Sequence, residues 1–168
     1  DKVWNLSRQS AGIVLRFRTD APELHAKWSL TSDRLEMFHM PATGVSGLDL
    51  YVHDGNQWRW ANTPRPTGIE NQAKLVSGLE PVMRDWMIYL PLYNSVKSVA
   101  VGIPEGHAIK PMDGRPEGEK PILFYGTSIT HGACASRPGM THVAIIGRDL
   151  DREVINLGFS GNGTMDLE

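Results

Sequence analysis

The stretch ILFYGTSITHG, residues 122–132, decides the fold of the second part of the chain. A continuous apolar run ends at Gly126, and this pattern is typical of a parallel strand covered on both faces. Two hydroxyl side chains, Thr127 and Ser128, follow directly. Ser128 is therefore either a nucleophile on a sharp turn or a residue that caps the next helix, since serine and threonine often do so.

The residues after this stretch complete one structural unit. Val143, Ile146 and Leu150 recur at helical spacing and predict a helix. The sequence EVINLGFSGNG, residues 153–163, predicts a second strand that ends in a glycine-rich loop. Strand, loop, helix and strand in this order predict one right-handed βαβ unit of an open α/β sheet.

The first hundred or so residues have a different pattern. Apolar residues alternate with polar ones, and Gly, Pro, Asn and Asp interrupt the alternation, which predicts short strands with one buried face. Leu24, Ala26, Trp28 and Leu30 share one such face, and residues 48–63 predict a hairpin. Several short strands without a long helical pattern predict an all-β sandwich or jelly roll.

These patterns divide the chain into three segments. We expect the β-sandwich over residues 1–106, a linker over 107–120 and the α/β segment over 121–168. The linker is rich in Pro, Gly and charged residues and has no periodicity. A single βαβ unit cannot bury both faces of its sheet. We therefore expect the segment after Lys120 to pack on the sandwich, to pair with another chain or to belong to a longer polypeptide.

The composition limits the possible functions. The chain has 168 residues, 40% of them hydrophobic, which suffices for one ordinary domain or two small units. Seventeen Lys and Arg stand against 19 Asp and Glu without runs of like charge, so a nucleic-acid partner is not expected. The single cysteine, Cys134, excludes a disulfide framework. No apolar stretch approaches the roughly 18 residues that cross a bilayer.

The two loops that follow the predicted strands carry the candidate chemistry. In an open parallel sheet the carboxyl ends of the strands lie at one edge, so Gly126–Ser128 and Gly158–Gly163 should lie side by side. A serine beside backbone N–H donors is the arrangement that acyl transfer needs. The G-x-S-x-G elbow is not met, because Thr130 replaces its second glycine. The second loop also permits a phosphate-binding interpretation, but no lysine follows it as in a P-loop.

Three motifs of the chain resemble those of a known family. FYGTSITHG together with VINLGFSGNG resembles the first two sequence blocks of the SGNH or GDSL-type hydrolases, with Thr127 in place of the usual Asp. The segment Gly47–Tyr51, GLDLY, resembles the Gly-x-Asp-Leu-Tyr signature of a β-rich domain that precedes the hydrolase domain in one subfamily. The resemblance implies a jelly-roll-like β-domain followed by the start of a flavodoxin-like SGNH hydrolase domain.

The resemblance also implies an activity and site residues. It suggests a serine esterase that hydrolyses a small acyl ester, with an acetylated carbohydrate as the expected substrate class and no cofactor or metal. Ser128 matches the nucleophile and one oxyanion N–H donor, and Gly161 matches a second donor. The family's Asn donor and its Asp-x-x-His pair have no counterpart, so the chain looks truncated and is expected to be inactive alone. His131 and His142 are expected to be surface or loop residues.

Another class of function stays open. The β-domain could be a non-catalytic module that binds a carbohydrate or a partner, with the α/β segment as a structural remnant. Trp28 and Trp86 are predicted to lie in the core, whereas Trp58 and Trp60 could lie in the core or bind sugar rings. Asp49 and Tyr51 could join the two domains, and Arg137 could bind an anionic group or brace its loop. The location is left open by the sequence, with a bacterial periplasm or secretion as the expectation.

Overall fold

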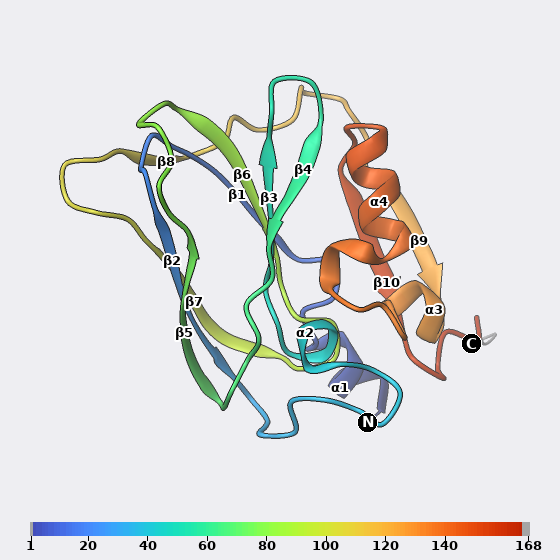
Figure 1. Cartoon of the computed structure of the whole chain (residues 1–168). Helices are drawn as coiled ribbons and strands as arrows, with labels where there is room; N and C mark the ends of the chain where they lie inside the picture. The colour runs from blue at the N-terminus through green and yellow to red at the C-terminus, as the bar shows by residue number, and fades with distance from the viewer. Residues whose placement is uncertain (1, 166–168) are drawn as a thin grey trace.

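A computed structural model of the chain, which describes residues 2–165, shows two parts packed against each other. The first part is an antiparallel β-sandwich, and a βαβ unit lies beside it (Figure 1). This arrangement confirms the predicted fold class.

The sandwich consists of a five-stranded sheet and a three-stranded sheet. The larger sheet has the order β4-β3-β6-β1-β8, with the bounds Trp58–Asn62, Asp49–His53, Arg84–Tyr89, Val14–Thr19 and Ile109–Pro111. The smaller sheet has the order β5-β2-β7, with the bounds Glu70–Val76, Leu24–Leu30 and Val96–Gly102. All neighbouring strands in both sheets are antiparallel, and β3 and β4 form the predicted hairpin.

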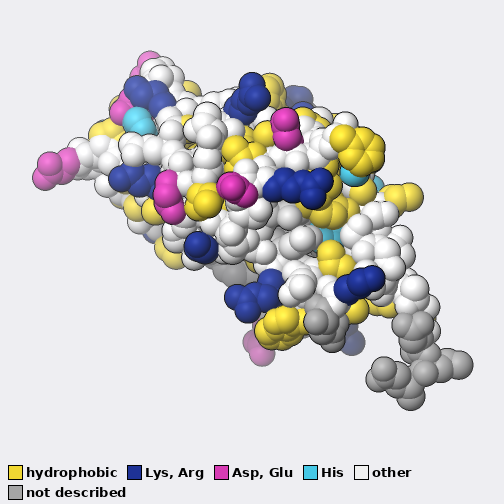
Figure 2. Space-filling model, turned by 90° about the horizontal axis from the view of Figure 1, so that it is seen from below, with side chains coloured by type: hydrophobic (Ala, Val, Ile, Leu, Met, Phe, Trp, Pro, Cys, Tyr) yellow, Lys and Arg dark blue, Asp and Glu magenta, His cyan; other side chains and the backbone are white. Residues whose placement is uncertain are grey.

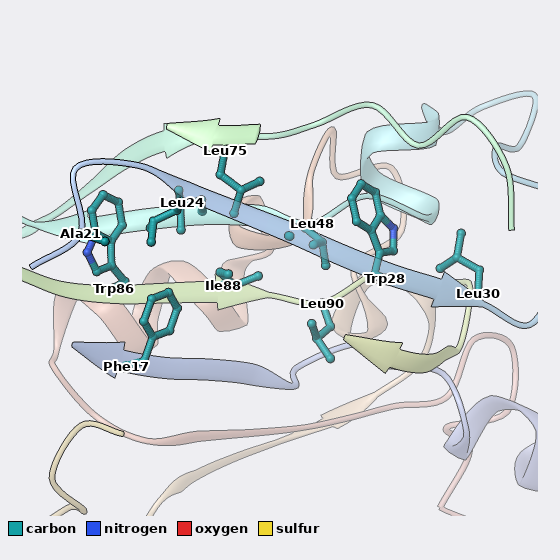
Figure 3. Close-up of a cluster of buried hydrophobic side chains, with 12 residues drawn as sticks. Phe17, Ala21, Leu24, Trp28, Leu30, Leu48, Leu75, Trp86, Ile88 and Leu90 are labelled. Carbon is teal, nitrogen blue, oxygen red and sulfur yellow. The ribbon is translucent and has the colours of Figure 1, made fainter. Parts of the chain in front are cut away.

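The hydrophobic core lies between the two sheets, as Figure 3 shows. Trp28 of β2 and Trp86 of β6 are each 2% exposed, which confirms their predicted place in the core. The alternating residues of β2 that share a face with Trp28 are buried as well, namely Leu24, Ala26 and Leu30. Period-two alternation therefore identified the inner face of this strand correctly.

The first part also contains two short helices that were not predicted. They are α1, Lys2–Ser7, and α2, Ala42–Val45. Helix α1 has six residues, which is too short for helical periodicity to be recognised in the sequence, and none of its residues is buried. Strand β8 falls inside the segment expected to be a linker and pairs with β1. The division at residues 106 and 107 remains a prediction.

The second part is the predicted βαβ unit. Strand β9, Ile122–Gly126, and strand β10, Val154–Gly158, are parallel, and Gly126 lies opposite Gly158. Between them lie the short helix α3, Ser128–His131, the 3-10 turn η1, Pro138–Met140, and helix α4, His142–Asp149. Because the two strands end at the same level, the loops that follow them start at the same edge of the sheet.

One expectation about this sheet is wrong for the described residues. Strand β9 was expected to be covered on both faces, but Leu123 and Tyr125 are 56% and 42% exposed. On the other face, Phe124 contacts the ring of His142 at the start of α4. The helical elements between two strands cover one face of the sheet and leave the opposite face open.

The βαβ unit packs on the outer face of the larger sheet. Ala144 of α4 lies in one buried cluster with Tyr51, Met87 and Tyr89 of that sheet. The guanidinium group of Arg148 lies 4.1 Å from the centre of the Tyr51 ring. Of the three arrangements expected for the segment after Lys120, the described residues adopt packing on the sandwich.

The surface has no dominant charge on the face seen in Figure 2. Positively and negatively charged side chains are interspersed with apolar ones there. Among the helices of residues 2–165, none has the length and apolar character needed to cross a bilayer.

Candidate active site

Ser128 lies directly after the first parallel strand. It is the first residue of α3, two positions beyond the end of β9, and its side chain is half-buried. The Ser128 hydroxyl forms no hydrogen bond with any residue between 2 and 165, and Thr127 makes no side-chain capping bond to α3. The capping interpretation of Ser128 is therefore wrong, and its hydroxyl is available for other chemistry.

The glycine-rich loop after β10 lies against the Ser128 loop. The Phe159 N–H donates to the Gly126 carbonyl over 2.8 Å, which joins the starts of the two loops. Gly161 has a φ of +71°, a conformation that favours glycine. The predicted juxtaposition of the two loops is thus present.

Two backbone N–H groups in these loops have no partner among the described residues. They belong to Ser128 and Gly161, and neither donates to another group between residues 2 and 165. Backbone N–H donors that are fixed in place and free to bind a developing oxyanion are a principal source of stabilisation in acyl transfer. The roles of Ser128 and Gly161 as nucleophile and oxyanion donors remain predictions that this arrangement permits.

His131 was expected at the surface or in a loop, and this expectation is wrong. It lies at the end of α3 and is 1% exposed, because this side of α3 faces the sandwich. Its Nε2 lies 2.8 Å from the Leu92 carbonyl oxygen, and its ring stacks on Tyr93 with the ring centres 4.2 Å apart. Burial lowers the pKa of His131. A buried imidazole that donates to a carbonyl is a structural group rather than a base for Ser128.

A serine nucleophile requires an activating base, and no described residue is hydrogen-bonded to Ser128 as such a base would be. His142 is exposed at the start of α4, as expected. Across residues 2–165 no histidine, aspartate or glutamate side chain forms a hydrogen bond with the Ser128 hydroxyl. The same residues contain no cluster of His, Cys, Asp and Glu that could hold a metal ion.

The Gly-Leu-Asp-Leu-Tyr segment joins the two parts. The Asp49 carboxylate is completely buried and accepts hydrogen bonds from the Gly139 N–H over 2.7 Å and the Thr63 hydroxyl over 2.6 Å. Burial raises the pKa of Asp49, and its hydrogen-bond donors oppose that shift. Together with the contact between Tyr51 and α4, these bonds confirm that Asp49 and Tyr51 hold the two parts together.

Arg137 braces the loop that follows α3. Its Nε lies 3.3 Å from an Asp49 carboxylate oxygen, and its guanidinium group lies 4.8 Å from the centre of the Trp60 ring. Trp60 is 52% exposed and donates its indole N–H to Asp49, whereas Trp58 packs against the cluster between the two parts. The bracing interpretation of Arg137 is therefore the one that the contacts support.

Sequence reasoning missed Tyr93 as a residue of the candidate site. The Tyr93 hydroxyl lies 3.4 Å from the Ser128 carbonyl oxygen and 3.4 Å from the Ser160 Oγ. Tyr93 belongs to an irregular segment of the β-domain, between β6 and β7. Neither periodicity nor a motif links that segment to the loops after β9 and β10, so no local signal could have found it.

The fold and the loops define the class of protein. A β-sandwich that packs on the start of an α/β domain, with a serine after the first parallel strand and a glycine-rich loop after the second, is the arrangement of an SGNH-type hydrolase with a preceding β-domain. Residues 1–109 match the model of the GxDLY family, described as the N-terminus of SGNH-hydrolase-type esterases. Residues 119–168 match the GDSL-like lipase/acylhydrolase family. The chain belongs to the SGNH or GDSL-type esterases that carry a GxDLY β-domain.

Solved structures are similar over almost the whole chain. A protein from Bacteroides ovatus ATCC 8483, provisionally described as a GDSL-like lipase, is 35% identical with a TM-score of 0.91, and the match covers 98% of this chain and 48% of that one. The salicylyl-acyltransferase SsfX3 from a tetracycline biosynthetic pathway is 23% identical with a TM-score of 0.68, and the match covers 92% of this chain and 42% of that one. A family two carbohydrate esterase from Clostridium thermocellum, solved with cellohexaose, is 18% identical with a TM-score of 0.63. The match covers 91% of this chain and 46% of that one.

The chain thus spans less than half the length of these three solved structures. No curated protein matches the chain. The similarities below 25% identity concern the fold alone.

Proposed function

We propose that the protein containing this chain is a serine esterase that hydrolyses a small acyl ester, with an acetylated carbohydrate as the substrate class. The observation that carries the proposal is the unpartnered Ser128 hydroxyl after β9, beside a glycine-rich loop whose Gly161 N–H is also unpartnered. Membership of an esterase family supports the reaction type. The fold shared with a carbohydrate esterase that was solved with cellohexaose supports the substrate class.

The proposed mechanism assigns two steps to this chain. The Ser128 hydroxyl attacks the acyl carbonyl and forms a tetrahedral intermediate, whose oxyanion accepts hydrogen bonds from the N–H groups of Ser128 and Gly161. Collapse of the intermediate releases the alcohol and leaves the acyl group on Ser128, and water then releases the acid. The proton passes from Ser128 to a histidine oriented by an aspartate, and this histidine then donates it to the oxygen of the departing alcohol. We expect both residues in the part of the hydrolase domain that this chain does not include.

Replacing Ser128 tests the proposal. In the protein with its complete hydrolase domain, Ser128→Ala should lower kcat/KM for 4-nitrophenyl acetate by about 10⁴-fold, because the variant lacks the hydroxyl that takes up the acyl group. Ser136→Ala is the matched control, since Ser136 is an exposed serine in the loop after α3, and it should keep normal activity.

The outcomes separate the candidate functions. Full activity in Ser128→Ala would overturn the assignment of the nucleophile. A wild-type protein that cleaves no ester would favour the non-catalytic binding module instead. A protein that cleaves 4-nitrophenyl acetate but releases no acetate from acetylated xylo-oligosaccharides would be an esterase of another substrate class.

A further inference from the structure

The irregular segment that contains Leu92 and Tyr93 is a fixed part of the β-domain. The Leu92 and Tyr93 N–H groups donate to the carbonyls of Gly44 and Val45 over 3.2 and 3.1 Å. The Leu92 side chain is 1% exposed and lies in a buried cluster with Met40 and Val45. This segment therefore presents its outward groups from a rigid support.

These outward groups meet α3 at three points. The Leu92 carbonyl lies 2.8 Å from His131 Nε2, and the Tyr93 ring stacks on the His131 ring at an interplanar angle of 16°. The Leu92 side chain also packs against Gly132, where a Cβ atom would lie 3.0 Å from a Leu92 methyl carbon. The β-domain therefore helps to hold α3, and with it the first residue of this helix, Ser128, in place.

The Tyr93 hydroxyl reaches both loops of the candidate site. It lies 3.4 Å from the Ser128 carbonyl oxygen, which also accepts the N–H groups of Gly132 and Ala133 that close the turn of α3. It lies equally far from Ser160 Oγ, one residue before Gly161. One side chain of the β-domain thus touches both loops that carry the unpartnered N–H groups.

We propose that Tyr93 is a positioning residue, which fixes the distance between the N–H groups of Ser128 and Gly161 through its contacts with both loops and with His131. This inference rests on the proposed esterase function. Oxyanion stabilisation depends on donors that are already in place before charge develops, so a small increase in loop freedom lowers kcat rather than substrate affinity. The β-domain would then be required for turnover even if it never touches the substrate.

Two variants separate the hydroxyl of Tyr93 from its ring. Tyr93→Phe keeps the stack on His131 and removes the hydroxyl, and we expect a decrease in kcat of about fivefold with KM unchanged. Tyr93→Leu also removes the stack, and we expect a decrease in kcat of about 50-fold. Both are measured with 4-nitrophenyl acetate in the protein with its complete hydrolase domain.

Tyr89→Phe is the matched control. Tyr89 is a buried tyrosine between the two parts, and its hydroxyl donates to the Ala144 carbonyl over 3.5 Å, away from Ser128. The Tyr89→Phe variant should lower the melting temperature as much as Tyr93→Phe does and leave kcat unchanged. Equal losses of kcat in the two phenylalanine variants would show that only general stability is involved and would overturn the inference.

Hydrogen exchange gives a measurement that does not depend on activity. In residues 1–168, Tyr93→Leu should speed amide exchange at 128–133 and at 159–163 together, while exchange in β2 stays unchanged. Unchanged exchange in both loops would refute the positioning role. If Ser128→Ala abolishes activity and Tyr93→Phe keeps the full kcat, this inference fails alone, whereas full activity of Ser128→Ala contradicts the proposed function.

Discussion

The imidazole of His131 is the most constrained titratable group near the candidate nucleophile. It is almost completely buried, its Nε2 faces the Leu92 carbonyl, and one face of the ring is covered by Tyr93. Burial lowers its pKa because the charged form loses its hydration. The folded protein therefore holds His131 neutral at a pH where an exposed histidine already binds a proton.

This difference predicts a pH dependence of stability. The folded pKa of His131 lies below the unfolded value of about 6.5, so the unfolded chain binds the proton first as the pH falls. The free energy of unfolding should therefore decrease as the pH drops below about 6.5, and His131→Gln should flatten this decrease. Urea unfolding of residues 1–168 between about pH 7.5 and pH 5 measures this dependence of the free energy of unfolding on pH.

His142→Gln serves as the control for that experiment. His142 is exposed, so this variant shows the effect of replacing a histidine that lies outside the buried contact with Leu92 and Tyr93. If His131→Gln keeps the wild-type slope, another group governs the pH dependence.

At the scale of elements, the end of β10 and the end of α3 touch through their backbones. A Cβ atom at Gly158 would lie 2.1 Å from the His131 backbone nitrogen, closer than any real contact. Because the obstacle is backbone, no side chain can rotate away, and α3 would have to shift. The close approach of these two elements requires a glycine at this position.

Gly158→Ala should consequently destabilise the protein. We expect a loss of about 3 kcal/mol in the free energy of unfolding, the upper end for overpacking a close contact. Gly114→Ala is the control, since its Cβ would have open space and its backbone has no positive φ. Urea unfolding of both variants in residues 1–168 provides the comparison, and equal stability of the two would contradict the contact between β10 and α3.

At the scale of the whole molecule, the sandwich and the βαβ unit share an interface that is both apolar and polar. Its apolar part is the cluster of Tyr51, Met87, Tyr89 and Ala144, and its polar part centres on the buried Asp49 carboxylate. The Thr43 hydroxyl adds a bond of 2.6 Å to the Ser136 carbonyl. An interface of this kind couples the folding of the two parts.

Replacing Asp49 should weaken the interface between the sandwich and the βαβ unit. Asp49→Asn keeps the shape but removes the charge that accepts the Gly139 N–H and faces Arg137, so we expect a loss of about 2 kcal/mol in stability. Amide exchange should rise more in residues 137–149 than in β2. Asp54→Asn, an exposed change in the β3–β4 turn, is the control, and a uniform rise in exchange with Asp49→Asn would argue against a local role.

The local patterns of the sequence predicted much of the fold. Alternation identified the inner face of β2 and the hairpin of β3 and β4, because side-chain direction in a strand depends only on the residue's position. The shift to a continuous apolar run predicted the parallel pair of β9 and β10. Helix α1 has only six residues, too few to show a helical period in the sequence.

The sequence by itself determined that Ser128 and the glycine-rich loop would meet, because parallel strands joined by a right-handed crossover end at one edge of their sheet. Its motifs also indicated the family to which the chain belongs. Only the tertiary structure decided that His131 is buried and that Tyr93 touches both loops. These contacts join residues far apart in the chain, and they depend on which face of α3 meets the sandwich, which no local periodicity encodes.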